Sequence, residues 1–447
     1  MTKIFPEEPK FVVGQVGFEG FDILGRKALG QRLTELVDRI DQPMVIALDG
    51  GWGTGKSFFL RLWVGAHKIE LNGKASIIYF DAFEHDYLDD PLINLVSAMI
   101  KKADDAPWAK SALKMIKVSA VKLAKPALRI GLAAATAGAT ELASAVWADA
   151  VIDATKNEAS GAVEDFWKKE SGRINAMQQF RKAIEELTKP SEAGQPPQKI
   201  VFIIDELDRC RPDYALSLLE IVKHFFSVEN VHFILGANIK ALEGSILARY
   251  GSEIDADAYL RKFIQLTVKL PKEHEGSDVK MYLSKNAQSF GLGTVVFSDL
   301  SALIAFPVFR DRVTIRDIQK IMTRISVCPK EFSSFAGPLR VFVLGLMLIE
   351  VSHKRLYTSI RSKSIVFTDV RSWLNIAQRD SMDRSHAALL CGTLNIFLGG
   401  ESGNLETDLF GGYNRISEIM AMLDKTVVDC LDIINVPYST NQRDQRV

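Results

Sequence analysis

The chain has 447 residues, which is too long for one typical hydrophobic core, so we expect two or three domains. Hydrophobic residues make up 47% and charged residues 25%, a balance that argues against large-scale disorder. Lysine plus arginine and aspartate plus glutamate are equal at 55 each, so the sequence lacks the basic excess of proteins that coat nucleic acid. The four cysteines form no CxxC pair and the N-terminus has no apolar signal segment, so we expect a cytoplasmic protein.

The first half of the chain alternates short apolar runs with helical patterns. A helix is expected from Lys56 to about His67, and a second helix opens at Pro212, a favourable first-turn residue. Runs typical of buried parallel strands occur at 44–49, 75–80, 199–205 and 231–238. Strands that alternate with helices predict a parallel α/β sheet.

A long segment of helical character, from about residue 90 to residue 198, separates the second strand from the third. One amphipathic face there is marked by Ile174, Met177, Phe180, Ile184 and Leu187. Upstream, residues 130–152 are rich in alanine and small apolar residues. A membrane span needs about 20 largely apolar residues, and two acids, at 141 and 149, interrupt this stretch. We therefore prefer a soluble helical insertion, with a membrane-associated hairpin as the alternative.

The chain after Pro271 reads as helical. Residues 314–326 form an expected helix with Ile315, Ile318, Met322 and Ile325 inside. The apolar run at 341–349 is too short to span a membrane, and residues 416–431 carry another amphipathic pattern.

Eight residues between the first strand and its helix satisfy the pattern GxxxxGK[ST]. They are Gly50, Gly51, Trp52, Gly53, Thr54, Gly55, Lys56 and Ser57. Glycines let the backbone amides face phosphate groups, and the next helix presents its positive N-terminal end to the same anion. Lys56 is expected to reach the β- and γ-phosphates, and the Ser57 hydroxyl to bind Mg²⁺. The pattern predicts a phosphate-binding loop for ATP with Mg²⁺.

The strand that ends at Asp205 brings two adjacent carboxylates to the edge of the sheet where ligands bind in α/β proteins. We expect Asp205 to hold the Mg²⁺ shell, as a Walker B aspartate does. Glu206 is placed to polarise the attacking water as a general base. The strand therefore predicts the second half of a nucleotide-hydrolysing site.

Three more polar residues carry open interpretations. Asn238 either orients the attacking water, like a sensor residue, or caps the following helix. Arg209 either acts as an arginine finger toward a neighbouring subunit or forms a local ion pair with Asp208 or Asp213. Arg316 is either a lid arginine that touches the γ-phosphate or an ordinary exposed side chain.

Together these motifs resemble the KAP family of P-loop NTPases, in the class with an additional strand and a catalytic glutamate. The likeness covers roughly residues 15 to 330 and lies in the segments 22–26, 80–87, 203–210 and 259–271. Phe83 stands where the family usually has tryptophan. The resemblance implies that Gly25 and Arg26 approach the adenine. It also implies a helical insertion between the Walker motifs, frequently membrane-spanning in the family, and a link of bacterial relatives to phage exclusion or defence.

We predict an α/β fold with a parallel-sheet P-loop NTPase core at 15–270 and a helical insertion at about 90–198. A helical lid at 271–335 and a C-terminal helical domain at 336–447 follow. The expected activity is Mg²⁺-dependent ATP hydrolysis coupled to conformational change or assembly, with a protein partner or further copies of the chain. The alternatives are an ATP-binding regulatory scaffold with very slow hydrolysis, a DNA-handling motor, and a small-molecule kinase. Nucleic acid is not indicated as a partner, and the membrane remains an alternative partner through the insertion.

Overall fold

The computed structural model describes residues 12–87, 90–103, 110–123, 164–190, 195–270, 277–310, 312–327, 332–333, 337–374 and 386–398. The chain divides into two compact units, one from Phe11 to Pro271 and the other containing Lys272 to Val447. The first unit holds the phosphate-loop motif and the acidic strand, so it contains the candidate site.

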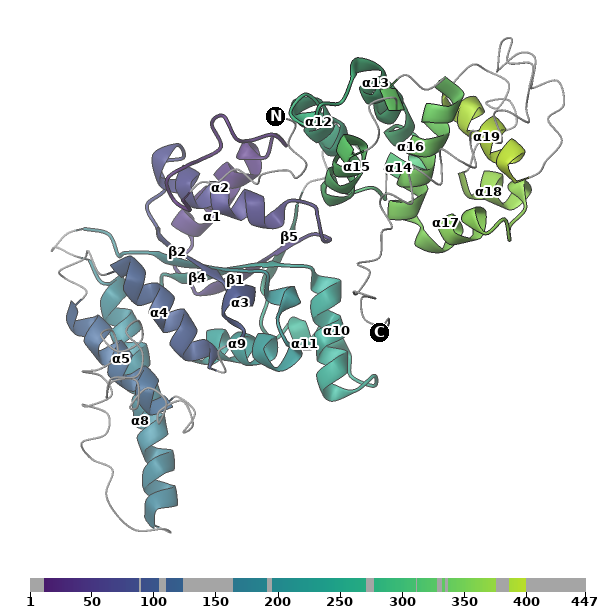
Figure 1. Cartoon of the computed structure of the whole chain (residues 1–447). Helices are drawn as coiled ribbons and strands as arrows, with labels where there is room; N and C mark the ends of the chain where they lie inside the picture. Colours follow the sequence, from purple (N-terminus) through teal and green to yellow (C-terminus); the bar gives the residue numbers. More distant parts are fainter. Residues whose placement is uncertain are drawn as a thin grey trace, which may run out of the picture. The chain divides into compact units, whose positions relative to one another are not determined.

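A five-stranded sheet forms the centre of the first unit (Figure 1). Its strands are β1 (Met44–Asp49), β2 (Ser76–Asp81), β3 (Ile200–Asp205), β4 (Val231–Ala237) and β5 (Leu266–Lys269). Their order is β2-β3-β4-β1-β5, and every neighbouring pair is parallel. The predicted parallel α/β fold is confirmed. Strand β4 lies between β1, which leads into the phosphate loop, and β3, which ends in the two acids.

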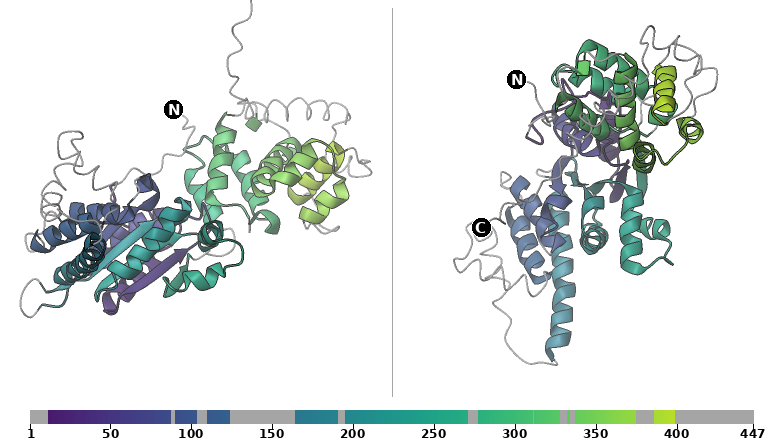
Figure 2. Two further views of the ribbon diagram at one scale, coloured as in Figure 1. Left: turned by 90° about the horizontal axis from the view of Figure 1, so that it is seen from below. Right: turned by 45° about the vertical axis from the view of Figure 1, so that its right-hand side comes forward.

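Helices cover both faces of this sheet (Figures 1 and 2). One face packs against α1 (Lys27–Arg39) and α2 (Lys56–Ile69), with Val201 and Ile203 of β3 among the buried side chains. The opposite face, with Phe202 and Ile204, packs in one core with α4 (Pro91–Ala103), α9 (Pro212–Phe225) and α10 (Ile239–Tyr250). Because successive strand residues point to opposite faces, a strand buried on both sides is continuously apolar. This explains why the apolar run alone located β3.

Strand β5 was missed from the sequence. It is a short edge strand whose side chains are mostly exposed, so it shows neither an apolar run nor a clean alternation. Backbone pairing with β1 decides its place. Gln265, directly before β5, adds two contacts: its N–H donates to the Val45 carbonyl at 3.0 Å, and its side-chain Oε1 accepts from the Val45 N–H at 2.7 Å. An edge strand made by main-chain hydrogen bonds leaves little trace in hydrophobic patterning.

The described part of the insertion comprises α4, α5 (Lys110–Leu123) and α8 (Glu164–Thr188), and α5 packs against α8 (Figure 1). Phe180, Ile184 and Leu187 are buried as predicted, but Ile174 is 47% exposed, so its assignment to this face is wrong. The buried stripe instead begins at Ala176, two residues further on. Two residues turn a helix by about 200°, which puts Ile174 on the other side.

The apolar stretch at 130–152 and the pattern at 416–431 lie outside the described residues. Within the part of the chain that the structure describes, no helix combines the length and the apolar character that a membrane crossing requires.

The described residues of the second unit form helices and the loops between them. Its helices are α12 (Ser277–Asn286), α13 (Thr294–Ile304), α14 (Pro307–Arg310), α15 (Ile315–Val327), α16 (Gly337–Ser352), α17 (Lys354–Arg361), α18 (Phe367–Leu374) and α19 (His386–Phe397). Ile318, Met322 and Ile325 of α15 share one core with residues 341–349 of α16, while Ile315 is half-buried. One hydrophobic core therefore includes helices before residue 335, where the predicted lid ends, and helices after it.

Candidate functional site

The loop between β1 and α2 is built by glycines that adopt left-handed backbone conformations. Gly53 has φ 80° and Gly55 has φ 85°, values that L-residues with a side chain rarely adopt. Helix α2 begins at Lys56, and the Lys56 ammonium donates to the carbonyls of Gly50 (2.6 Å) and Gly51 (3.2 Å). The Lys56 ammonium thus lies within the loop, beside the helix N-terminus that would face a phosphate.

Burial lowers the pKa of Lys56, and this effect is opposed by the negative charges of Asp208, Asp205 and Asp49. A partly desolvated ammonium interacts more strongly with a phosphate than a solvated one does, because the local dielectric constant is lower. The loop is therefore electrostatically suited to an anion.

The segment expected to approach the adenine contacts the phosphate loop. Gly25 has φ 64°, and the buried Arg26 donates from Nη1 to the carbonyl of Thr54 at 2.8 Å. The Asp22 carboxylate accepts from the N–H groups of Arg26 and Lys27, each at 2.8 Å, which fixes the start of α1. Arg26 therefore supports the loop backbone, and a contact with adenine stays a prediction.

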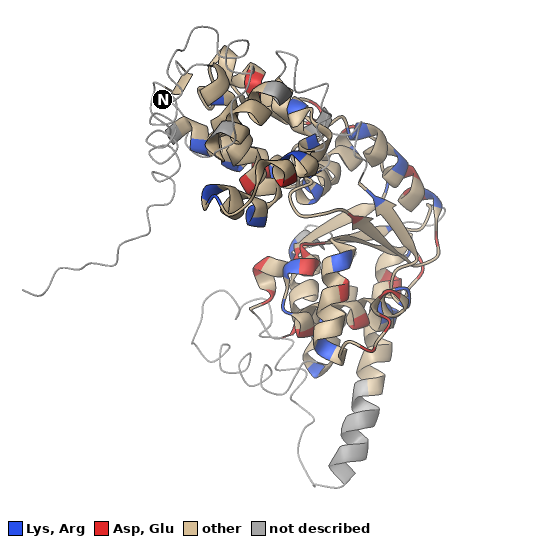
Figure 3. Ribbon diagram, turned by 90° about the vertical axis from the view of Figure 1, so that its right-hand side faces the viewer, with Lys and Arg blue, Asp and Glu red and all other residues tan. Residues whose placement is uncertain are grey.

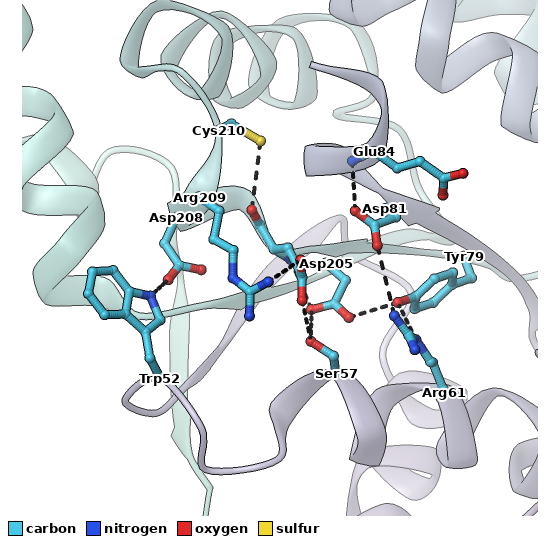
Figure 4. A network of polar contacts seen from close by, with 11 residues as sticks. Trp52, Ser57, Arg61, Tyr79, Asp81, Glu84, Asp205, Asp208, Arg209 and Cys210 are labelled. Atoms are coloured by element: carbon cyan, nitrogen blue, oxygen red, sulfur yellow. Dashed lines mark hydrogen bonds and ion pairs between the residues drawn. The ribbon is translucent and has the colours of Figure 1, made fainter. Parts of the chain in front are cut away.

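The structure brings the Ser57 hydroxyl beside Asp205 (Figure 4) and beside Glu206. The Ser57 hydroxyl lies 3.2 Å from Asp205 Oδ1 and 3.3 Å from Glu206 Oε1. Asp205 is fully buried, and burial raises its pKa to about 6 despite hydrogen bonds from Tyr79 and Ser57 that favour the charged form. A hydroxyl and two carboxylates thus converge beside the N-terminus of α2.

Glu206 has a left-handed backbone conformation, with φ 58° and ψ 27°, at the start of the short turn η3 (Leu207–Arg209). Such a conformation costs a non-glycine residue free energy and is concentrated at functional positions. Arg209 Nη1 lies 2.7 Å from Glu206 Oε2, whereas the sequence suggested Asp208 or Asp213 as its partner. The structure thus gives Arg209 a local acidic partner other than the two suggested by the sequence, and the arginine-finger role stays a prediction.

Asp208 instead accepts a hydrogen bond from Trp52 of the phosphate loop, with Nε1 2.6 Å from Oδ2. Trp52 as a whole is 55% exposed. This contact ties the tip of the loop to the turn that carries Glu206 and Arg209.

The other two candidates are Asn238 in the first unit and Arg316 in the second. Asn238 follows β4 at the N-cap position of α10, and its carbonyl accepts from Ala241 and Leu242, but its side chain makes no capping hydrogen bond to the described residues. Arg316 is exposed on α15 of the second unit. Their roles as sensor and lid residue stay predictions.

Sequence reasoning missed three residues beside Asp205, namely Tyr79, Arg61 and Asp81 (Figure 4). Tyr79 on β2 donates its hydroxyl proton to Asp205 Oδ2 at 2.7 Å, and burial raises the pKa of Tyr79 above its ordinary value. Arg61 on α2 donates from Nε to the Tyr79 oxygen at 3.2 Å and lies 4.0 Å from Asp81. The one available signal was a polar hydroxyl within an otherwise apolar strand.

The donor set fits Mg²⁺ bound together with a nucleotide. Within the described ranges, no group of three or more His, Cys, Asp or Glu side chains could hold a metal ion by itself. Mg²⁺, however, usually keeps several waters and takes only one or two carboxylates plus substrate phosphates. The Ser57 hydroxyl and the carboxylate of Asp205 supply hard oxygen ligands of that kind.

Comparison with known proteins agrees with this geometry. The family model described as the KAP family P-loop domain matches residues 26–332. A search of curated proteins finds no match. The matched range includes the phosphate loop, all five strands and α15.

Proposed function

This chain belongs to the KAP family of P-loop NTPases, and from that premise we propose that it binds ATP with Mg²⁺ and hydrolyses it. The observation that carries the proposal is the convergence of Ser57, Asp205 and Glu206 at the N-terminus of α2. Binding of a nucleotide follows from the family, while ATP, Mg²⁺ and hydrolysis are the proposed part.

In this proposal each group of the site has a separate role. The backbone of the loop and the Lys56 ammonium would hold the β- and γ-phosphates, and Ser57 and Asp205 would hold Mg²⁺. The cation, when bound, neutralises charge that develops on the phosphates. Glu206 would orient the attacking water and accept its proton.

We propose further that the nucleotide state is coupled to conformational change or assembly with a protein partner. Two contacts support this coupling, Trp52 with Asp208 and Arg209 with Glu206, because both join the phosphate site to the turn before α9. Basic and acidic residues are interspersed over the described helices of this unit, which gives no preference for a DNA partner (Figure 3). A role in phage exclusion is carried by the family resemblance and is tested by phage plating with and without Lys56→Ala.

The direct test is Glu206→Gln. Glutamine keeps the shape of the side chain but cannot accept a proton, and general-base assistance contributes about 10²–10⁴-fold. We expect turnover to fall by about two orders of magnitude or more. Affinity for ATP with Mg²⁺ should change little, because the phosphates and the cation are held by other groups. Steady-state hydrolysis and titration calorimetry measure the two quantities.

The matched control is Asp205→Asn, which should weaken Mg²⁺-dependent binding itself. Hydrolysis at the parental rate by Glu206→Gln would assign the base elsewhere, with Asp208 and Glu84 as the next carboxylates to change. Loss of ATP affinity in Glu206→Gln would contradict the proposal that Glu206 acts on the attacking water and that other groups hold the nucleotide.

A second function, a nucleotide-binding regulator with very slow hydrolysis, is favoured by one specific observation. The Glu206 carboxylate is engaged by Arg209 on Oε2, and its Oε1 lies 3.3 Å from the Ser57 hydroxyl. A base held in this way accepts a proton from water only after release. Measured basal turnover separates this regulator from an efficient ATPase.

A further inference from the structure

Asp205 belongs to a closed ring of contacts between side chains of α2, β2 and β3. Asp205 Oδ1 accepts from the Ser57 hydroxyl at 3.2 Å, and Asp205 Oδ2 accepts from the Tyr79 hydroxyl at 2.7 Å. Arg61 Nε donates to the Tyr79 oxygen at 3.2 Å. Ser57 and Arg61 are four residues apart on α2, so one helical turn closes the ring (Figure 4).

The strand register makes this ring possible. In the parallel pair β2–β3, Tyr79 lies opposite Ile203, and Asp81 lies opposite Asp205. Side chains two residues apart on a strand share a face, so Tyr79 and Asp205 are diagonal neighbours on the face covered by α2. A tyrosine is long enough to reach across this diagonal to the carboxylate.

The direction of each hydrogen bond follows from proton counting. A phenol carries one proton, and a guanidinium can only donate. Because Arg61 occupies an acceptor site on the Tyr79 oxygen, the phenol proton is directed to Asp205 Oδ2. The second carboxylate oxygen, Oδ1, is then the one that faces Ser57 and the Glu206 N–H, which lies at 2.9 Å.

We propose that Tyr79 and Arg61 are positioning residues that fix the orientation of Asp205, so that its Oδ1 is presented beside Ser57 to the Mg²⁺ of the bound nucleotide. This role rests on the proposed function, because it requires that Asp205 serve the cation. Neither residue touches the nucleotide in this scheme, and both act through the carboxylate. Partners of this kind typically change metal affinity about 10–100-fold when they are removed.

The test is Tyr79→Phe, which removes one hydroxyl and keeps the ring. ATP binding is measured by titration calorimetry over a series of free Mg²⁺ concentrations and in the presence of EDTA. We expect the Mg²⁺ concentration for half-maximal enhancement of binding to rise about tenfold. Affinity in EDTA should stay at the parental value, since the loop and Lys56 are unaltered.

The matched control is Tyr214→Phe on α9, which also removes a buried hydroxyl, one that accepts from Asn94 Nδ2 at 3.1 Å outside the ring. Tyr214→Phe should change neither the Mg²⁺ concentration for half-maximal enhancement nor the ATP affinity in EDTA. Arg61→Met should raise the Mg²⁺ requirement less than Tyr79→Phe does, and it should add no further rise in a Tyr79→Phe background, because Arg61 acts through the phenol. This second variant keeps the proposal testable if Tyr79→Phe does not fold.

An unshifted Mg²⁺ requirement in folded Tyr79→Phe would overturn the positioning role. So would an equal shift in Tyr214→Phe, or an equal loss of affinity with and without Mg²⁺. If the parental protein itself binds ATP without any Mg²⁺ dependence, the proposed function fails and the positioning role fails with it. A Mg²⁺-dependent parent with an unshifted variant removes the positioning role alone.

Discussion

At the scale of single residues, the site combines two buried or half-buried carboxylates with different partners. Asp205 is held by donors on three sides, from Tyr79, Ser57 and the Glu206 N–H. Glu206 is held by a charged partner, Arg209, and lies 3.3 Å from the Ser57 hydroxyl. A carboxylate with neutral donors is suited to a fixed role, while one in an ion pair near the surface can exchange partners at low cost.

Arg209→Ala tests whether the ion pair restrains the base. An ion pair that is partly exposed is worth up to about 1 kcal/mol, so release of Glu206 should raise basal turnover by up to about fivefold. The rate is measured at low protein concentration, where a neighbouring subunit is absent. A finger role would appear instead as a loss of turnover in Arg209→Ala confined to high concentration. Unchanged turnover at both concentrations contradicts both roles of Arg209.

The pKa of Asp205 predicts a pH dependence for the metal. Burial raises the pKa of this carboxyl to about 6, so a proton competes with Mg²⁺ below that pH. In this regime Mg²⁺ affinity should fall about tenfold per pH unit, and above it the group should contribute no further change. Titration of Mg²⁺-dependent ATP binding between about pH 5 and pH 8 measures this dependence of Mg²⁺ affinity on pH. Asp205→Asn should not show this fall in Mg²⁺ affinity at low pH. A Mg²⁺ affinity of the parental protein that stays constant down to pH 5 would exclude the raised pKa.

At the scale of elements, the close approach of β4 to β3 limits what can stand beside Asp205. Gly236 of β4 lies opposite Asp205 in the parallel register. A Cβ added there would lie 2.5 Å from Asp205 Oδ1 and 2.5 Å from Leu60 Cδ1 of α2. Strand β4 therefore has to carry a glycine opposite Asp205 for α2 and strand β3 to approach each other.

Gly236→Ala should push Asp205 away from Ser57. We expect an overpacking cost of about 1–3 kcal/mol in the free energy of unfolding, together with a higher Mg²⁺ requirement. The matched change is Gly244→Ala on α10, where nothing lies within 4 Å of the added Cβ; it should stabilise the helix by about 0.5–1 kcal/mol. Denaturant unfolding compares the two variants, and equal stabilities would contradict the packing argument.

At the scale of the whole molecule, each unit has its own interior. The first unit packs the sheet between helices, and the second packs α13, α15, α16 and α19 around a separate core. In the second unit Asp299 is buried with two partners: Arg340 Nε lies 2.5 Å from one carboxylate oxygen and His386 Nε2 lies 2.9 Å from the other. This network links α13, α16 and α19.

Because the units have separate cores, we expect two calorimetric unfolding transitions. ATP with Mg²⁺ at one hundred times its dissociation constant should stabilise only the first unit, by about 2.7 kcal/mol. Lys56→Ala should abolish that shift. Arg340→Met should lower only the other transition, by up to about 3–5 kcal/mol, the cost of removing one member of a buried ion pair, because of its two partners Asp299 then keeps only His386. A single transition that both changes move together would show that the units unfold as one.

Much of the first unit was predictable because its signals are local. The phosphate loop needs glycines with positive φ at set positions, and a strand buried on both faces needs an unbroken apolar run, as in residues 200–204. Both requirements are visible in adjacent residues. They predicted Lys56 and Ser57 at the start of a helix and Asp205 at the end of a strand, and the fold has them there.

Tertiary structure decided the contacts between distant segments. The pairing of Trp52 with Asp208, the ring through Tyr79 and Arg61, and the strand order that puts β4 beside β3 join residues far apart in the chain. No periodicity encodes such pairs, because each depends on the register of two strands or on the direction of one helix. The same reason explains β5, whose place in the sheet is set by backbone hydrogen bonds to β1. The sequence by itself thus determined the kind of site, and the fold determined which side chains hold its two carboxylates.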